Sequence, residues 1–519
     1  MEYVVRRSAR ILLATAAIAF TPVTAWSQTL FERIGLSALQ SRLGSGAPNG
    51  TGVSVMQAEA LILSEGPNAY LPNSTQPQMA GKTFIDQSAG GILGAGTFSS
   101  HATGVGNFFY GTQAGVGVAP GITTINAYRV QGNLDAGDWI GGAYINFGAG
   151  APVATPTQRV QNHSWIGTGA FTADEQEITR RYDFALRRDN SIGVVGVDNS
   201  TTFPALMANS YNSIAVGVFR LSPPAPGQPS SVGPTIGDVP GRSKPDLVAP
   251  NDFTSSATPL VAGSAALLVQ TADQMGNANA GRLETIKSVL LTGATKQPFA
   301  GLAQPWNRTN NGTYVEPLDR RYGAGQVNVN NSHLVLTAGQ KNGTDLGLDG
   351  PMGWDFQTLT SVGATRTYYV SVPVGLSVEF TATVDWLRRI TPTGTGSNLF
   401  ATSDASLSTI ELRLFNTNPD LTLAGLIDSS ISPIDNVQHL YRTDLLTNSV
   451  YALQVTLAGM PAGQSSEDFA VSWYALVAVP EPQTIIAMSG VGLIGLYFAV
   501  QYYRRRTAQD AILVGVDSE

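Results

Sequence analysis

A serine stands at the start of an apolar stretch that has the composition of a buried helix. Ser255 is surrounded by small residues in the segment 254–258, and a run rich in Ala, Leu and Val follows it to residue 268. A hydroxyl at the mouth of a helix lies near free backbone N–H groups and the positive end of the helix dipole, which favour a developing oxyanion. The segment therefore suits a serine nucleophile. The alternative interpretation is a buried helix capped by Ser or Thr.

Two other segments place polar side chains at the ends of short apolar strands. Residues 50–60 are typical of a glycine turn that feeds a buried strand, and this strand ends in the carboxylate of Glu59. Residues 191–197 are typical of a hydrophobic strand that is followed by Asn199. By themselves these residues are equally an ordinary Glu at a strand end and a turn Asn after a strand.

The segment around Ser255 resembles the nucleophile motif of the subtilisin-like serine peptidases (subtilases), G-T-S-M-A-[ST]-P-H-V-A-G. Ser255 falls on the nucleophile, while Phe253, Ser256 and Leu260 depart from the motif. The resemblance extends in order from about residue 49 to residue 336. It implies a parallel sheet with helices on both faces and the site at the carboxyl ends of the strands.

The resemblance also assigns a carboxylate to the site. Residues 50–59 resemble the first subtilase motif, G-x-G-V-x-V-A-V-[IL]-D, with Glu59 at the position of the aspartate. That acid holds the histidine tautomer and stabilises the imidazolium, which a glutamate can also do from a shifted backbone. Asp86 is the competing carboxylate, but it lies where the family has a second strand and loop, so Glu59 is favoured.

The imidazole and the amide of the site come from two further motifs. Residues 99–106 resemble H-G-T-H-V-A-G, which makes His101 the general base at a helix start. Residues 191–218 resemble V-V-x-A-A-G-N-x-G … [YF]-P-A … V-I-x-V-G-A, which makes Asn199 the oxyanion-hole asparagine. Asp198 departs from this motif, because the family has Gly there.

A last motif implies a substrate-binding segment. Residues 160–167 resemble V-[IV]-N-x-S-x-G, in which the Ser-x-Gly backbone pairs with the substrate chain and borders the first specificity pocket. Ser164, Trp165 and Gly167 are the substrate-binding residues that follow from it. For His163 a packing role is the favoured interpretation.

The two ends of the chain have the composition of targeting segments. Residues 1–27 combine arginines, a short apolar run and a small-x-small cleavage site, which predicts a signal peptide rather than a membrane anchor. Residues 479–506 combine Pro-Glu-Pro, an uncharged span and three arginines. This tail resembles a PEP-CTERM sorting signal, which implies an exosortase-type processing enzyme, with a transmembrane helix and a cytoplasmic tail, 507–519. An ordinary single-span anchor is the alternative.

Composition limits the remaining choices. A net charge of −7 argues against nucleic-acid binding, and the absence of cysteine excludes disulfides and Cys-ligated metals.

The chain is expected to contain a subtilisin-like domain over 28–343 and an all-β sandwich over 344–478. The sandwich is expected because β-rich runs alternate with turn residues there, and it resembles the jelly-roll domains that follow bacterial subtilase domains. The cofactor is unknown: calcium bound by Asp404 or Asp435 and Asn436 would serve stability, but no ligand spacing is diagnostic. Residues 28–49 are too few for the folded pro-domain of many subtilases.

These inferences predict an exported or cell-surface serine endopeptidase with a protein or peptide substrate and at least transient membrane attachment through the C-terminus. Ser255 attacks a peptide carbonyl, His101 transfers the proton, Glu59 orients His101, and Asn199 stabilises the oxyanion. The alternative is a catalytically impaired protein of the same fold that acts as a binding or structural module, which the departures from the motifs favour.

Overall fold

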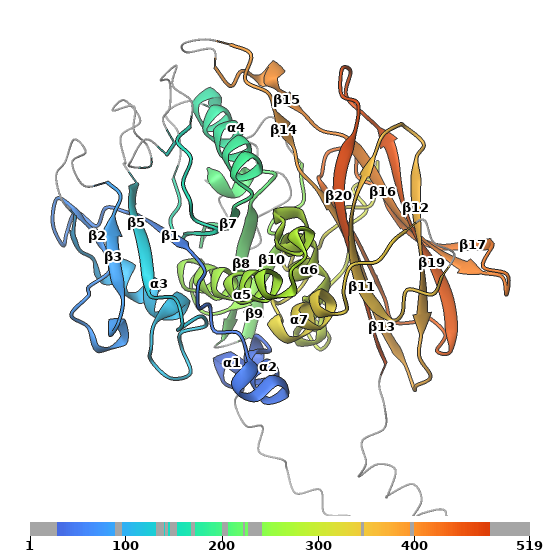
Figure 1. Ribbon diagram of the computed structural model, residues 1–519, viewed down its shortest axis with the longest axis horizontal. Helices are drawn as coiled ribbons and strands as arrows, with labels where there is room; N and C mark the ends of the chain where they lie inside the picture. The colour runs from blue at the N-terminus through green and yellow to red at the C-terminus, as the bar shows by residue number, and fades with distance from the viewer. Residues whose placement is uncertain are drawn as a thin grey trace, which may run out of the picture.

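The computed structural model places an α/β domain beside two antiparallel β-sheets (Figure 1). The residues that the structure describes are 28–88, 96–130, 140, 144–145, 153–167, 172–199, 206–221, 224–226, 241–343, 347–394 and 399–477. The predicted signal peptide and the predicted C-terminal transmembrane helix both lie outside them. None of the helices in these ranges is long and apolar enough to cross a membrane.

Seven parallel strands form the sheet of the α/β domain. Their spatial order is β10-β8-β7-β6-β1-β5-β3, and a short strand, β9, pairs antiparallel with β8. The strands are β1 (Val55–Ala60), β3 (Thr83–Asp86), β5 (Thr124–Val130), β6 (Val160–His163), β7 (Ile192–Gly196), β8 (Ile214–Leu221), β9 (Pro224–Pro226) and β10 (Leu247–Pro250). The central strands are buried along their length, as expected for a parallel sheet covered on both faces.

The helices of this domain are mostly long enough to cover the sheet. They are α1 (Leu30–Arg33), α2 (Leu36–Leu43), α3 (Ser100–Tyr110), α4 (Thr172–Asp189), α5 (Thr254–Met275), α6 (Leu283–Gly293) and α7 (Val329–Thr337). On β7, a side chain at Gly193 would meet Tyr182 of α4, whereas one at Gly196 would meet Thr258 of α5. Because residues three apart in a strand point to opposite faces, α4 and α5 cover the two faces of the sheet, as the sequence predicts.

The strand order reverses direction around β1. From β1 the sheet extends through β5 to β3 on one side and through β6, β7 and β8 to β10 on the other. Crevices at the carboxyl ends of parallel strands are where α/β sheets bind ligands. Glu59 near the end of β1, Ser164 after β6 and Asn199 after β7 all lie at this edge.

The second part of the protein consists of two four-stranded antiparallel sheets, ordered β11-β20-β13-β18 and β12-β19-β16-β17. The strands are β11 (Met352–Leu359), β12 (Thr365–Val372), β13 (Val378–Trp386), β16 (Thr409–Thr417), β17 (Leu423–Ser430), β18 (Val437–Arg442), β19 (Ser449–Gly459) and β20 (Glu467–Val477). The β-rich runs of the sequence at 366–372, 376–384, 409–415, 450–457 and 469–477 correspond to β12, β13, β16, β19 and β20, whereas β11, β17 and β18 are not predicted by it. Two minor pairs join β2 (Ala69–Leu71) to β4 (Thr97–Phe98) and β14 (Arg389–Ile390) to β15 (Ala405–Ser406).

The two parts are packed directly on one another. In Figure 1, α6 and α7 lie between the parallel sheet and the strands β11, β13 and β20, and contacts of α6 with β13 and β20 join them. The larger hydrophobic core lies mainly in the α/β domain but includes Trp354 and Tyr474 of the antiparallel sheets. A second core, with Trp386 and Trp473, fills the space between the two antiparallel sheets.

Candidate active site

A carboxylate and an imidazole are joined at the carboxyl edge of the parallel sheet. Oε2 of Glu59 lies 2.9 Å from Nδ1 of His101. Glu59 is buried, with 1% of its surface exposed, whereas the His101 side chain keeps 35% exposure. The hydrogen bond to Glu59 raises the pKa of His101 above its ordinary value, and the charges of Glu59 and Glu65 add to this, while burial opposes it. An imidazole held in this way through Nδ1 presents Nε2 to its surroundings.

Local sequence explains how His101 is placed. The side chain of Ser99 caps α3 by accepting the backbone N–H of Ala102, so His101 is the second residue of the helix. In the loop after β1, Glu65 accepts the backbone N–H of Ser100 at 2.7 Å. The loop that follows Glu59 is therefore bonded to the start of the helix that carries His101.

The competing carboxylate, Asp86, is engaged elsewhere. Its two oxygens accept the hydroxyl of Tyr70 at 2.7 and 2.8 Å. They also accept the backbone N–H groups of Ser88 at 2.9 Å and Gly96 at 3.2 Å. The structure thus brings Glu59, and not Asp86, to the ring of His101.

Ser255 lies in the first turn of α5. The residue before the helix, Phe253, has no side-chain group that caps it. The cap comes instead from Asn199, whose Oδ1 accepts the backbone N–H of Thr254 at 2.8 Å and its hydroxyl at 3.1 Å. Two donors on one side identify the atom that faces them as the oxygen, so the Nδ2 amide of Asn199 points the other way.

One pocket collects these groups. It has a volume of about 260 Å³ and is lined by His101, Asn199, Ser255 and Thr254 from the site, together with Ala60, Ile62, Ser164, Trp165, Ile166, Gly196 and Val197. Two of the predicted substrate-binding residues, Ser164 and Trp165, belong to this lining. Gly167 does not, and the neighbouring Ile166, 43% exposed, takes part instead.

His163 lies in the core beside Trp165, one of the residues that line the pocket. Its ring packs edge-on against Trp165 and Tyr182, and burial lowers its pKa to about 3. It therefore stays neutral near physiological pH and supports the wall of the pocket from behind.

Sequence reasoning missed two residues that support the acid, one by a direct hydrogen bond and one through the other residue. Gln57 donates its amide to Glu59, and the hydroxyl of Tyr110 donates to Gln57. A polar side chain two positions before Glu59, in a strand that is otherwise buried and apolar, is the signal that could have revealed Gln57.

The described residues contain no group of three or more His, Asp or Glu placed to hold a metal ion. The candidate calcium ligands bond to protein donors: Asp404 accepts the hydroxyl of Thr393 at 2.5 Å, and Asp435 accepts the backbone N–H of Ser243 at 2.8 Å.

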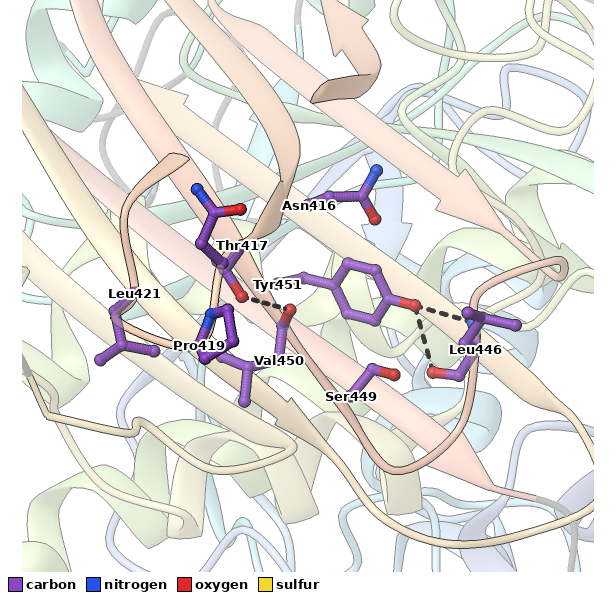
Figure 2. A pocket seen from close by; sticks show the side chains of 9 residues that line it. Asn416, Thr417, Pro419, Leu421, Leu446, Ser449, Val450 and Tyr451 are labelled. Carbon is purple, nitrogen blue, oxygen red and sulfur yellow. Dashed lines mark hydrogen bonds between the residues drawn. The ribbon is translucent and has the colours of Figure 1, made fainter. Parts of the chain in front are cut away.

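A separate pocket lies on the antiparallel sheets (Figure 2). It has a volume of about 360 Å³, and its lining includes Leu421 and Tyr451. The Tyr451 hydroxyl bonds to the backbone of Leu446, accepting its N–H at 2.7 Å and donating to its C=O at 3.1 Å. The phenol group thus closes the loop beside the pocket.

Sequence comparison identifies two segments of the chain. Residues 86–325 match the model of the subtilase family, and residues 478–506 match that of the PEP-CTERM protein-sorting motif. The first match contains His101, Asn199 and Ser255 but begins after Glu59. No curated protein matches the chain.

The solved structures that match part of the chain have low sequence identity and low TM-scores. The patellamide maturation protease PatA is 18% identical, with a TM-score of 0.36, over 56% of this chain and 98% of that one. The epidermin leader peptide processing serine protease EpiP of Staphylococcus aureus is 14% identical, with a TM-score of 0.38, over 59% and 81%. Pseudomonas sedolisin, a serine-carboxyl proteinase, is 14% identical, with a TM-score of 0.36, over 56% and 95%.

Proposed function

We propose that the subtilase-family domain of this chain is a serine endopeptidase that transfers the acyl group of a peptide bond to water. The observation that carries this proposal is the pocket in which Ser255, His101 and Asn199 meet, with the buried Glu59 bonded to His101 at 2.9 Å. A hydroxyl, an imidazole, a carboxylate and an amide in this relation are the parts that hydrolysis by a serine nucleophile needs.

In the proposed reaction, Oγ of Ser255 attacks the peptide carbonyl carbon while Nε2 of His101 takes the hydroxyl proton. The imidazolium is stabilised by Glu59, and it then gives the proton to the leaving amine as the C–N bond breaks. Water then attacks the acyl-enzyme while Nε2 of His101 takes a proton from it. His101 returns this proton to Oγ of Ser255 as the acyl–oxygen bond breaks, which releases the carboxylic acid.

The oxyanion of the tetrahedral intermediate is proposed to bind between Nδ2 of Asn199 and the backbone N–H of Ser255. Asn199 is suited to this because the bonds from Thr254 to its Oδ1 fix the direction of the amide before substrate arrives. Donors that are oriented in advance stabilise developing charge without reorganising. The positive end of the α5 dipole adds to the effect.

We propose that the substrate chain runs along the edge formed by Ser164 and Trp165, with Gly167 extending that edge. The apolar side chains of Ile166 and Phe253 are 43% and 60% exposed, and Ile166 lines the pocket. Exposed apolar side chains that gather beside a pocket are typical of a binding surface, and we propose that these two side chains contact the substrate. Phe253 precedes Ser255 by two positions, and the same exposed ring is the observation that favours the alternative, a non-catalytic binding module.

The C-terminal motif supports a proposal for the location of the protein. A PEP-CTERM motif points to export and sorting at the cell envelope. We propose that the signal peptide over 1–27 directs export, that the C-terminal segment attaches the protein to the membrane at least transiently, and that an exosortase-type enzyme processes it there.

A fluorophosphonate probe tests the proposed activity, because it forms a Ser Oγ–P bond and expels fluoride only at an activated serine. We expect labelling of the folded wild-type protein at Ser255, located by peptide mass spectrometry, and hydrolysis of casein. Ser255→Ala should abolish both, whereas Ser256→Ala, which removes the neighbouring hydroxyl, should retain them. A folded wild-type protein that is neither labelled nor hydrolyses casein would favour the binding module.

A further inference from the structure

A buried glutamine bonds to the acid of the proposed triad. Gln57 and Glu59 are two residues apart in β1, so their side chains point to the same face of the sheet, towards α3. Nε2 of Gln57 donates to Oε1 of Glu59 at 2.8 Å, while Oε2 of Glu59 faces His101 at 2.9 Å. The two carboxylate oxygens therefore have different partners, and the carboxylate is held from both sides.

The same amide also fixes the helix that carries His101. The second N–H of Gln57 Nε2 donates to the backbone C=O of Ala102 at 2.9 Å, directly after His101. Its Oε1 accepts the hydroxyl of Tyr110, the last residue of α3. Gln57 thus joins β1 to both the beginning and the end of α3.

The partners leave one orientation for the Gln57 amide. A backbone carbonyl accepts only, so the atom that faces Ala102 is the NH₂ group. Burial, followed by the charge of Glu59, raises the pKa of Tyr110 well above its ordinary value, so its hydroxyl stays protonated and donates to Oε1. Gln57, Glu59 and Tyr110 are all at most 1% exposed, so no water replaces these bonds.

We propose that Gln57 is a positioning residue that allows a glutamate, instead of the shorter aspartate, to orient the catalytic histidine. In the motif that residues 50–59 resemble, position 57 holds a valine, which has no donor for the carboxylate. Here a glutamate at position 59 occurs together with an amide at position 57. Because the Gln57 amide binds Oε1 of Glu59, the other oxygen, Oε2, is held towards His101. This inference rests on the proposed function.

The titration of His101 provides a readout that a merely structural role would not change. The chain has four histidines. Burial lowers the pKa of His163 to about 3 and that of His333 to about 4, and it holds the pKa of His439 well below its ordinary value. His101, whose pKa is raised mainly by the hydrogen bond to Glu59, therefore titrates apart from the others. Of the other charges near it, Glu65 also raises its pKa.

The test measures this titration by NMR of histidine-labelled full-length protein in a Ser255→Ala background, which prevents self-cleavage. We expect Gln57→Leu to move the His101 titration to lower pH, because a carboxylate without its amide partner leaves the ring or takes up a proton. With Ser255 present, kcat should fall about 10- to 100-fold while KM stays within about twofold. Gln57→Asn keeps the amide but shortens its reach, and should act in the same direction.

Gln161→Leu is the matched control. Gln161 is a fully buried glutamine on the neighbouring strand β6, and its amide bonds to Tyr144 and Ser191 rather than to Glu59. This variant should lose stability without moving the His101 titration.

An unchanged His101 titration and an unchanged kcat in folded Gln57→Leu would overturn the proposal, and Gln57→Asn decides in the same way if the Leu variant does not fold. An equal shift in Gln161→Leu would also overturn it. A wild-type protein that the fluorophosphonate does not label would refute the proposed activity separately, since the NMR comparison does not require turnover.

Discussion

The ring of His101 lies near two carboxylates that act on it differently. Glu59 is buried and bonds to the ring directly, whereas Glu65 is exposed and bonds to the backbone of Ser100. A charge in a buried site is weakly screened, while an exposed charge acts through water and salt. Glu59 therefore sets both the direction and the basicity of the imidazole, whereas Glu65 acts on the basicity through its charge and bonds to the start of α3 rather than to the ring.

Proposed catalysis should depend on pH through His101. The base must be neutral to accept the serine proton, so kcat/KM should fall as the pH drops through the pKa of His101, which lies above the ordinary value of about 6.5. Glu59→Gln should move this limb to lower pH, because the interaction that raises the pKa is removed. It should also lower kcat by about 10³–10⁴-fold, because the imidazole loses its tautomer control.

Glu65→Gln is the control for this pH profile. It should move the limb in the same direction but by less, with kcat within about threefold of the wild type, since screened charges contribute little. Asp86→Asn should leave the limb in place. A limb that moves with Asp86→Asn and not with Glu59→Gln would reassign the acid.

Helix α6 joins the two parts of the protein through polar groups. The hydroxyls of Ser288 and Thr292 bond to Thr383 of β13 and Ser472 of β20, at 2.7 to 3.0 Å for the side-chain contacts and the Thr383 carbonyl. Lys287 forms a fully buried ion pair with Asp385 at 3.0 Å. Buried polar contacts of this kind add little to the stability of the protein. Removing one partner of such a contact, however, destabilises the protein strongly, because the other partner stays buried without it.

Two buried lysines near this boundary should respond in opposite ways to replacement. Burial lowers the pKa of Lys296 to about 7, and its Nζ bonds to a backbone carbonyl at 3.2 Å. The folded state thus binds fewer protons than the unfolded state between about pH 7 and 10, and the free energy of unfolding should rise with pH over this range. Lys296→Met should flatten that slope and stabilise the protein at pH 7 by about 1–3 kcal/mol.

Lys287→Met should instead destabilise the protein by about 3–5 kcal/mol, because Asp385 is left as a buried carboxylate without its cation. Denaturant unfolding at pH 7 and pH 9 measures both effects. Stabilisation by Lys287→Met, or destabilisation by Lys296→Met, would contradict this account of the boundary.

At the scale of the whole molecule, the antiparallel sheets are bonded to the α/β domain at several places. Besides α6, Asn436 donates to the backbone carbonyl of Tyr211 at 2.9 Å, and Asp435 accepts the backbone N–H of Ser243 at 2.8 Å. These groups are buried together with apolar side chains of both parts, so separating the two parts would expose that apolar surface to water. The antiparallel sheets are therefore an integral part of the folded protein rather than only a spacer.

A variant that ends at residue 343 should therefore not reach a soluble folded state, and the full-length protein should unfold in one transition. Differential scanning calorimetry should give a calorimetric enthalpy equal to the van't Hoff enthalpy. Two separate transitions, or a truncated protein that fluorophosphonate still labels, would show that the α/β domain folds by itself. The domain boundary between residues 343 and 344 stays a prediction until then.

Much of the fold could be predicted because its signals are local. Glycine turns, buried apolar runs and helix starts predicted the strands at Glu59 and before Asn199 and the helix starts at His101 and Ser255. The strands β11, β17 and β18 were missed because their apolar pattern is weak: β17 is exposed along half its length. Their pairing with neighbours, rather than their own sequence, makes them strands.

By itself the sequence determined the order of the four candidate side chains, and its resemblance to the subtilases implied the edge of the parallel sheet at which they would gather. Only the tertiary structure decided that Glu59 rather than Asp86 reaches His101, that Gln57 holds the carboxylate, and that α6 bonds to the second part of the protein. These outcomes depend on side-chain reach across a few ångströms, mostly between residues that are tens to hundreds of positions apart. No local pattern encodes that distance.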